Sequence, residues 1–151
     1  MNSLSPGLAG ALLAVALAGT QPAIAEEMPA DVQVTDQTVG DGAEVQRGWF
    51  AIMHFTGWVY DEQAPGHKGR RFADSRERGR PTTFVYGYQR ALIGLEKGMR
   101  GMRAGGKRTV VVPPKLGYDG LKYATPKDVP PGSALVFDVE LLDVVPQQNT
   151  N

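Results

Sequence analysis

The side chains that most often carry chemistry are scarce in this chain. It has no cysteine, and its two histidines, His54 and His67, do not stand at a metal-ligand spacing. Residues 101–107 (GMRAGGK) imitate the start of a phosphate-binding loop, but Arg108 stands where Ser or Thr must hold magnesium. A Ser-His-Asp site stays compatible with the composition, although the sequence contains no G-x-S-x-G element. The sequence therefore predicts neither a metal site nor a cofactor.

Aromatic residues at predicted strand ends and in loops are the remaining candidates for a binding site. They are Phe55, Phe72, Phe84, Tyr118 and Phe137. An ordinary hydrophobic core is the simplest interpretation of Phe84. The other four stand within short motifs that follow one another along the chain, and these motifs make them candidates for the wall of an apolar pocket.

The pattern of apolar residues predicts many short strands and one short helix. The helix is expected over 89–99, where apolar residues recur at helical spacing and glycine ends the pattern. Strands are expected over 32–35, 49–60, 71–75, 83–86, 107–112 and 134–144. This composition of elements indicates an α+β fold, an antiparallel sheet with the helix packed on one side. A Pro- and Gly-rich loop over 115–132 is long enough to suggest a function.

The beginning of the chain is typical of a secretory signal peptide. Residues 1–25 carry no charged side chain, and the apolar run at 8–18 is too short to span a bilayer as a helix. Ala23-Ile24-Ala25 is a small-x-small cleavage site directly before Glu26. No Lys or Arg precedes the apolar run, and an uncleaved anchor or a disordered tail is the alternative interpretation. Cleavage after Ala25 predicts a periplasmic or secreted protein.

The charges of the chain balance, with 16 Lys and Arg against 16 Asp and Glu, and all of them follow the predicted signal peptide. Such a chain has no electrostatic reason to bind nucleic acid or, after cleavage, an anionic membrane. The expected organisation is a signal peptide (1–25), a lead-in with the first strand (26–47), one domain (48–145) and a C-terminal tail (146–151).

Seven short motifs occur in one order along residues 32–144. They are HFTGW (54–58), FADSRERGRP (72–81), FVYG (84–87), LIGLEKG (92–98), GMRAGGKR (101–108), PPKLGY (113–118) and VPPGSALVFDVEL (129–141). In type and order they are similar to the motifs of the FKBP-type peptidyl-prolyl cis-trans isomerases, and the chain resembles a bacterial, exported member of that family.

The resemblance implies a half-wrapped antiparallel β-sheet around one short α-helix, with an apolar pocket between them that accepts proline. By resemblance, the site residues are Phe55, Phe72, Leu92, Leu95, Tyr118, Val129 and Phe137. The backbone N–H of Leu92 is expected to hold the carbonyl of the substrate. The implied partners are proline-containing peptides or unfolded exported proteins, together with macrolide ligands.

Rotation of a prolyl bond needs no nucleophile, acid or metal. The barrier is about 20 kcal/mol, and the twisted amide is less polar than the planar one. A dry pocket that binds the twisted form more tightly therefore lowers the barrier. This chemistry is compatible with a sequence that is so poor in catalytic motifs.

The chain departs from the family pattern at several pocket positions. Phe55 replaces a Tyr and Ala73 an Asp, so that only Arg78 remains of a polar network of three side chains. Asp74 is expected to reach Arg78 only if the strand bulges there. Leu95 replaces the Trp floor, and we expect a wider, shallower pocket. Two interpretations stay open: an isomerase that assists the folding of exported proteins, and a non-catalytic module that binds peptides or a protein.

Overall fold

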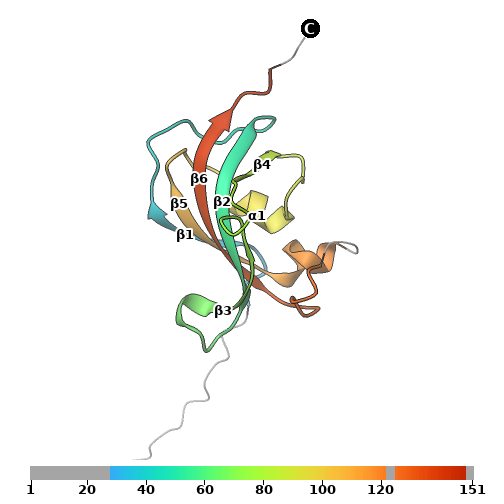
Figure 1. Ribbon diagram of the computed structural model, residues 1–151. Helices are drawn as coiled ribbons and strands as arrows, with labels where there is room; N and C mark the ends of the chain where they lie inside the picture. The colour runs from blue at the N-terminus through green and yellow to red at the C-terminus, as the bar shows by residue number, and fades with distance from the viewer. Residues whose placement is uncertain (1–27, 122–124, 149–151) are drawn as a thin grey trace, which may run out of the picture.

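The computed structural model describes residues 28–121 and 125–148, which form one antiparallel sheet with a short helix on one side (Figure 1). The strands are β1 (Gln33–Thr38), β2 (Phe50–Tyr60), β3 (Lys68–Asp74), β4 (Thr82–Val85), β5 (Lys107–Val112) and β6 (Leu135–Val145). The helix is α1 (Ile93–Gly98), and three 3-10 turns lie at η1 (Pro65–His67), η2 (Pro114–Leu116) and η3 (Tyr118–Gly120). The predicted α+β fold, a half-wrapped sheet around one short helix, is confirmed. The predicted signal peptide and the last residues of the tail lie outside the described residues.

The order of the strands in the sheet is β1-β5-β6-β2-β3, and β4 also pairs with β2. One edge of β2 is therefore divided between two partners. Residues 50–53 of β2 pair with β4, and residues 56–60 pair with β3. The connection over 75–81 leaves the sheet where these two partners meet, beside Phe55. Ser75 fixes this point, because its N–H donates to Phe55 O at 3.0 Å and its hydroxyl accepts from Phe55 N at 2.9 Å.

The core is built on alternate residues of the two longest strands. Leu135, Phe137, Val139 and Leu141 of β6 are all at most 1% exposed, as the predicted inward face requires. Ala51 and Met53 of β2 share this core. β6 pairs with β5 along one edge and with β2 along the other, so its inward face lies in the middle of the sheet.

The helix is shorter than the predicted range of 89–99. Gln89 has a positive φ of 54°, which helical backbone excludes, and α1 begins only at Ile93. The N–H groups of Gly87, Gln89 and Ala91 bond to the carboxylate of Glu96 instead of continuing the helix backwards. The apolar spacing that suggested a longer helix belongs partly to a loop that folds back onto α1.

Two glycines allow α1 to lie directly against β5. A β-carbon at Gly94 would stand 2.4 Å from Val112 Cγ1, and one at Gly98 would stand 2.3 Å from Val110 Cγ1. Both distances are below contact distance, so any side chain there would push the helix off the sheet. This close packing places the start of α1 over the apolar face on which the site is built.

The segment that imitates a phosphate-binding loop precedes β5, as the sequence indicated, and its Arg108 has a structural role. The Arg108 guanidinium donates to Asp36 and to the carbonyls of Gly98 and Arg100 at the end of α1. Its hydrogen bond to Asp36 lowers the pKa of that carboxyl. In the part of the chain that the structure describes, no helix is long and apolar enough to cross a membrane. Over the same residues, no three His, Cys, Asp or Glu side chains are grouped so that they could hold a metal ion.

Candidate functional site

A cavity of about 260 Å³ lies between the start of β2, β4, the beginning of α1 and the turn at Tyr118. Its lining is apolar on the sheet side and carries arginine and threonine at its mouth. The lining residues are Met53, Phe55, Arg78, Thr82, Thr83, Phe84, Arg90, Ala91, Leu92, Leu95, Tyr118 and Phe137. The volume is somewhat below the roughly 300–1,000 Å³ of pockets for drug-sized ligands, so the cavity suits a single small side chain.

Edge-to-face aromatic contacts form the apolar wall of the cavity. The Phe137 ring meets Phe55 at a centroid distance of 6.1 Å and Phe72 at 5.8 Å. Phe72 in turn meets Tyr118 at 5.9 Å. Gly57 makes room for these rings, because a β-carbon there would stand 2.8 Å from Phe72 Cζ and 2.9 Å from Phe137 Cε1. The rings hold one another in place, so the wall is preorganised.

Five of the seven site residues expected from the sequence line this one cavity: Phe55, Leu92, Leu95, Tyr118 and Phe137. The structure does not place the other two on the lining. Phe72 stands behind it, in contact with Tyr118 and Phe137. Val129 is only 4% exposed and belongs to the buried core cluster.

The backbone of Leu92 is held in a conformation that leaves its N–H available. Leu92 caps α1 with φ −59° and ψ 136°, and its carbonyl accepts from Glu96 N at 3.0 Å. Among the described residues, no acceptor is hydrogen-bonded to Leu92 N. The N–H groups of Gln89 and Ala91 in the preceding loop, by contrast, donate to Glu96. A donor without a partner at the edge of an apolar cavity suits a substrate carbonyl.

Tyr118 supplies the other polar group of the apolar region. The side chain is half-buried, and burial raises the pKa of its phenol above the ordinary value. A phenol is already protonated at neutral pH, and the shift acts in the same direction, so Tyr118 presents a neutral O–H. The apolar part of the site therefore offers hydrophobic surface and neutral donors, and the charged donors of Arg78 and Arg90 lie at its mouth.

Arg78 lies at the mouth of the cavity, and Asp74 is not its partner. Its guanidinium carbon stands 5.7 Å from the centroid of the Phe55 ring. Asp74, which the sequence left as a conditional partner of Arg78, does not pair with it. The register of the β2–β3 pair shifts between Gly57 and Trp58, where β3 advances from Ala73 to Arg71. The irregularity therefore lies directly before Asp74. Asp74 instead bonds Arg71 at 3.1 Å and accepts from the N–H of Arg76.

Sequence reasoning missed part of the site. Met53, Thr83 and Arg90 line the cavity, and Glu96 shapes the loop over it. Met53 stands on the same strand face as Phe55, so the alternation of β2 could have indicated it. The contributions of Arg90 and Glu96 depend on the loop conformation, for which the sequence carries no local signal.

Comparisons with known proteins agree with this geometry. Residues 42–142 match the family model described as FKBP-type peptidyl-prolyl cis-trans isomerase. The chain is 32% identical over 111 residues to an FK506-binding protein of Neisseria meningitidis serogroup B, covering 74% of this chain and 94% of that protein. It is also 32% identical over 118 residues to an FK506-binding protein of Streptomyces anulatus, covering 78% of this chain and 90% of that protein.

Solved structures show the same fold. The crystal structure of FkpA from Escherichia coli is similar with a TM-score of 0.63 and 30% identity, over 76% of this chain and 48% of that one. The crystal structure of AtFKBP13 is similar with a TM-score of 0.62 and 30% identity, over 74% of this chain and 91% of that one. The chain belongs to the family of FKBP-type peptidyl-prolyl cis-trans isomerases. Its enzyme class is that of the peptidyl-prolyl cis-trans isomerases.

Proposed function

We propose that this protein isomerises prolyl bonds in exported proteins outside the cytoplasm, with the cavity beside Leu92 as its active site. The observation that carries the proposal is the unbonded N–H of Leu92 at the edge of a preorganised aromatic wall. A proline ring would occupy the apolar part of the cavity, and the carbonyl of the residue next to it would accept from Leu92 N.

The chemistry follows from the difference between planar and twisted amides. A planar prolyl amide is polar and well hydrated, whereas the twisted amide has lost its resonance. Phe55, Leu95 and Phe137 would surround the proline with apolar surface that stabilises the twisted form relative to the planar one. The Leu92 N–H would hold the chain on one side of the rotating bond, so that only the other side turns.

Tyr118→Ala is expected to lower kcat/KM for a proline tetrapeptide by roughly tenfold, which corresponds to ~1.4 kcal/mol of lost transition-state stabilisation. The reason is that Tyr118 closes one side of the cavity and supports Phe72. The measurement is the rate of cis-to-trans conversion of the peptide on addition of the enzyme. Tyr60→Ala is the matched control, since Tyr60 stacks on His67 outside the cavity and its loss should leave the rate unchanged.

Two outcomes separate the interpretations. A parent rate above the uncatalysed one, reduced by Tyr118→Ala alone, supports the isomerase. Binding of the peptide without acceleration would indicate a peptide-binding module instead. Because relatives are named for FK506 binding, we also propose that this macrolide inserts one of its rings into the same cavity and competes with the peptide. A macrolide that binds the protein without displacing the peptide would contradict that assignment.

The extracytoplasmic part of the proposal is supported by the first 25 residues, which carry no charge and end in Ala23-Ile24-Ala25. Intact mass measurement of protein recovered from an exporting bacterium is expected to show a species that begins at Glu26. Ala25→Arg places a large charged residue at the cleavage position and should block processing. Recovery of the parent protein still beginning at Met1 would contradict the prediction.

A further inference from the structure

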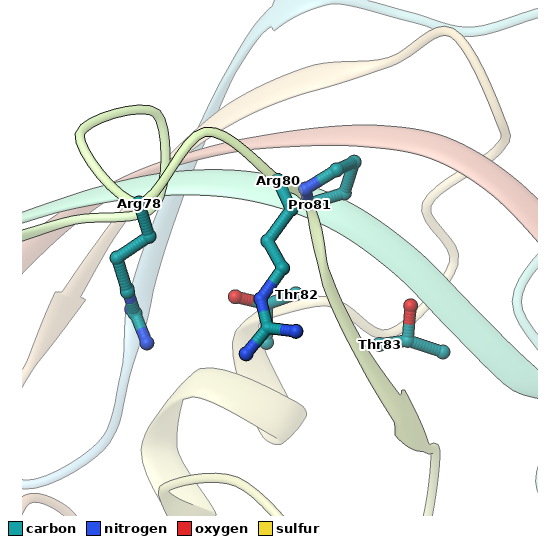
Figure 2. A pocket seen from close by; sticks show the side chains of 5 residues that line it. All are labelled: Arg78, Arg80, Pro81, Thr82 and Thr83. Atoms are coloured by element: carbon teal, nitrogen blue, oxygen red, sulfur yellow. The ribbon is translucent and has the colours of Figure 1, made fainter.

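Three arginines surround the mouth of the proposed active site. Arg78 and Arg90 line the cavity beside Leu92. Arg78 also lines an adjoining hollow of about 450 Å³, together with Arg80, and Thr82 and Thr83 are common to both hollows. Figure 2 shows that the side chains of Arg78 and Arg80 extend from the 75–81 connection in the same direction. Their guanidinium groups therefore face one continuous depression.

Acidic partners are provided for several other arginines of the chain, but for none of these three among the described residues. Arg71, Arg76, Arg103 and Arg108 each pair with a carboxylate. In the part of the chain that the structure describes, no ion pair or hydrogen bond involves the side chain of Arg78, Arg80 or Arg90, and no Asp or Glu lines either hollow.

The neighbours of Arg78 explain why its charge is not neutralised by the protein. Ala73 and Phe55 have no polar side-chain atom, and the carboxylate of Asp74 is already bound by Arg71 and by the N–H of Arg76. Glu77, which precedes Arg78, is also paired with Arg71. The Arg78 guanidinium is positioned by the face of the Phe55 ring instead. It thus remains able to donate to a carboxylate from outside the protein.

A group of uncompensated guanidinium ions attracts an anion. Each guanidinium can bind a carboxylate through two parallel N–H donors, and like charges that are close together favour a ligand that relieves their repulsion. All three arginines are exposed, so the attraction to a single carboxylate is modest and is screened by salt. A peptide in the cavity would bring its neighbouring side chains within reach of these groups.

We infer that the arginines at 78, 80 and 90 select prolyl segments that carry Glu or Asp within about two residues of the proline. This inference rests on the proposed function, because it assumes that the proline occupies the cavity. Each residue of an extended peptide advances about 3.3–3.6 Å, and the Arg78 guanidinium carbon lies 5.7 Å from the centre of a ring that lines the cavity. A carboxylate on a neighbouring residue spans that distance.

The test uses four tetrapeptides blocked at both ends: Ala-Glu-Pro-Phe, Ala-Gln-Pro-Phe, Ala-Pro-Glu-Phe and Ala-Pro-Gln-Phe. The Glu side chain is then the only formal charge, and each Gln peptide is its neutral match. The dissociation constant of each peptide is measured by titration, and the isomerisation rate is measured separately. At low salt, at least one Glu peptide is expected to bind about fivefold more tightly than its Gln match, equivalent to ~1 kcal/mol. This preference should shrink at about 0.5 M salt.

Variants identify the groups responsible. Arg78→Gln is expected to reduce the Glu-to-Gln preference to less than about twofold, and Arg80→Gln to reduce it partly. Arg78→Lys keeps the charge and should retain part of the preference. Arg103→Gln is the matched control, because it removes the same charge from a side chain that pairs with Glu44 away from the cavity. It should leave the preference unchanged.

The outcomes distinguish this inference from the proposed function. Equal affinities for Glu and Gln peptides in the parent, or a preference that Arg78→Gln leaves intact, would overturn the inference even if the enzyme isomerises all four peptides. A Glu preference that disappears in Arg78→Gln supports the inference even if no rate enhancement is found, in which case only the isomerase function fails.

Discussion

Phe137→Ala is expected to lower the free energy of unfolding by about 3–5 kcal/mol and to remove isomerase activity. The residue is 1% exposed and lies on the inward face of β6 with Leu135 and Val139. It also lines the cavity and contacts Phe55 and Phe72 edge-on. Truncation would leave a void in the middle of the sheet and release both neighbouring rings. Phe137 therefore serves both the core and the cavity.

Chemical denaturation of parent and variant measures the stability change. Leu142→Ala is the control on the same strand, since Leu142 is 38% exposed and its loss should change stability little. A Phe137→Ala curve shifted by less than about 1 kcal/mol would show that this face of β6 does not hold the core. Phe137→Leu separates the two roles. It fills part of the volume, so the variant should fold while the edge-to-face contacts and the activity are reduced.

The position of Phe137 was predictable because it depends on a local pattern. Apolar residues occupy alternate positions along the last strand, and alternate residues of a strand lie on the same face. The four apolar side chains are therefore buried together on the inward face. The candidates Phe55 and Tyr118 came from motifs in a known order, and the structure brings both to one cavity. The ordered motifs therefore allowed the fold and these residues of the pocket wall to be predicted from the sequence.

The rest of the site depends on contacts between distant segments, and the sequence does not predict these contacts. Val129 carries the right residue type for a pocket wall, but the structure places it in the core cluster and not on the lining. Asp74 does not pair with Arg78 in the folded chain. Its carboxylate accepts from Arg71 instead, which lies closer to it. Residue type and spacing identify such groups, but the choice of partner depends on loop geometry.

The start of α1 could not be predicted from the sequence either. Leu92, Leu95 and Met99 have helical spacing, and nothing in their types distinguishes a helix over 89–99 from one that starts at Ile93. The outcome is decided by the carboxylate of Glu96, which binds N–H groups of the preceding loop and so competes with helical hydrogen bonds there.

Glu96→Ala is expected to be the second most damaging substitution, with a loss of about 2–4 kcal/mol in the free energy of unfolding. The side chain is 6% exposed, and its two oxygens accept from the N–H groups of Gly87, Gln89 and Ala91 at 2.9, 3.3 and 3.1 Å. Without the carboxylate these donors lose their acceptor in a partly buried loop. Lys97→Gln is the control, because Lys97 is on the same helix but is exposed.

The effect of Glu96→Ala on activity follows from the position of the loop. The loop ends at Ala91, directly before the N–H that is proposed to hold the substrate, and Ala91 and Leu92 both line the cavity. Release of the loop should therefore raise KM for a proline peptide and shift the amide resonance of Leu92, whereas a purely global loss of stability would do neither in folded protein. Glu96→Asp keeps the charge on a shorter side chain and should lie between parent and Glu96→Ala in both respects. An unshifted Leu92 resonance in folded Glu96→Ala protein would mean that other contacts hold the loop, and the link between the buried carboxylate and the active site would then be wrong.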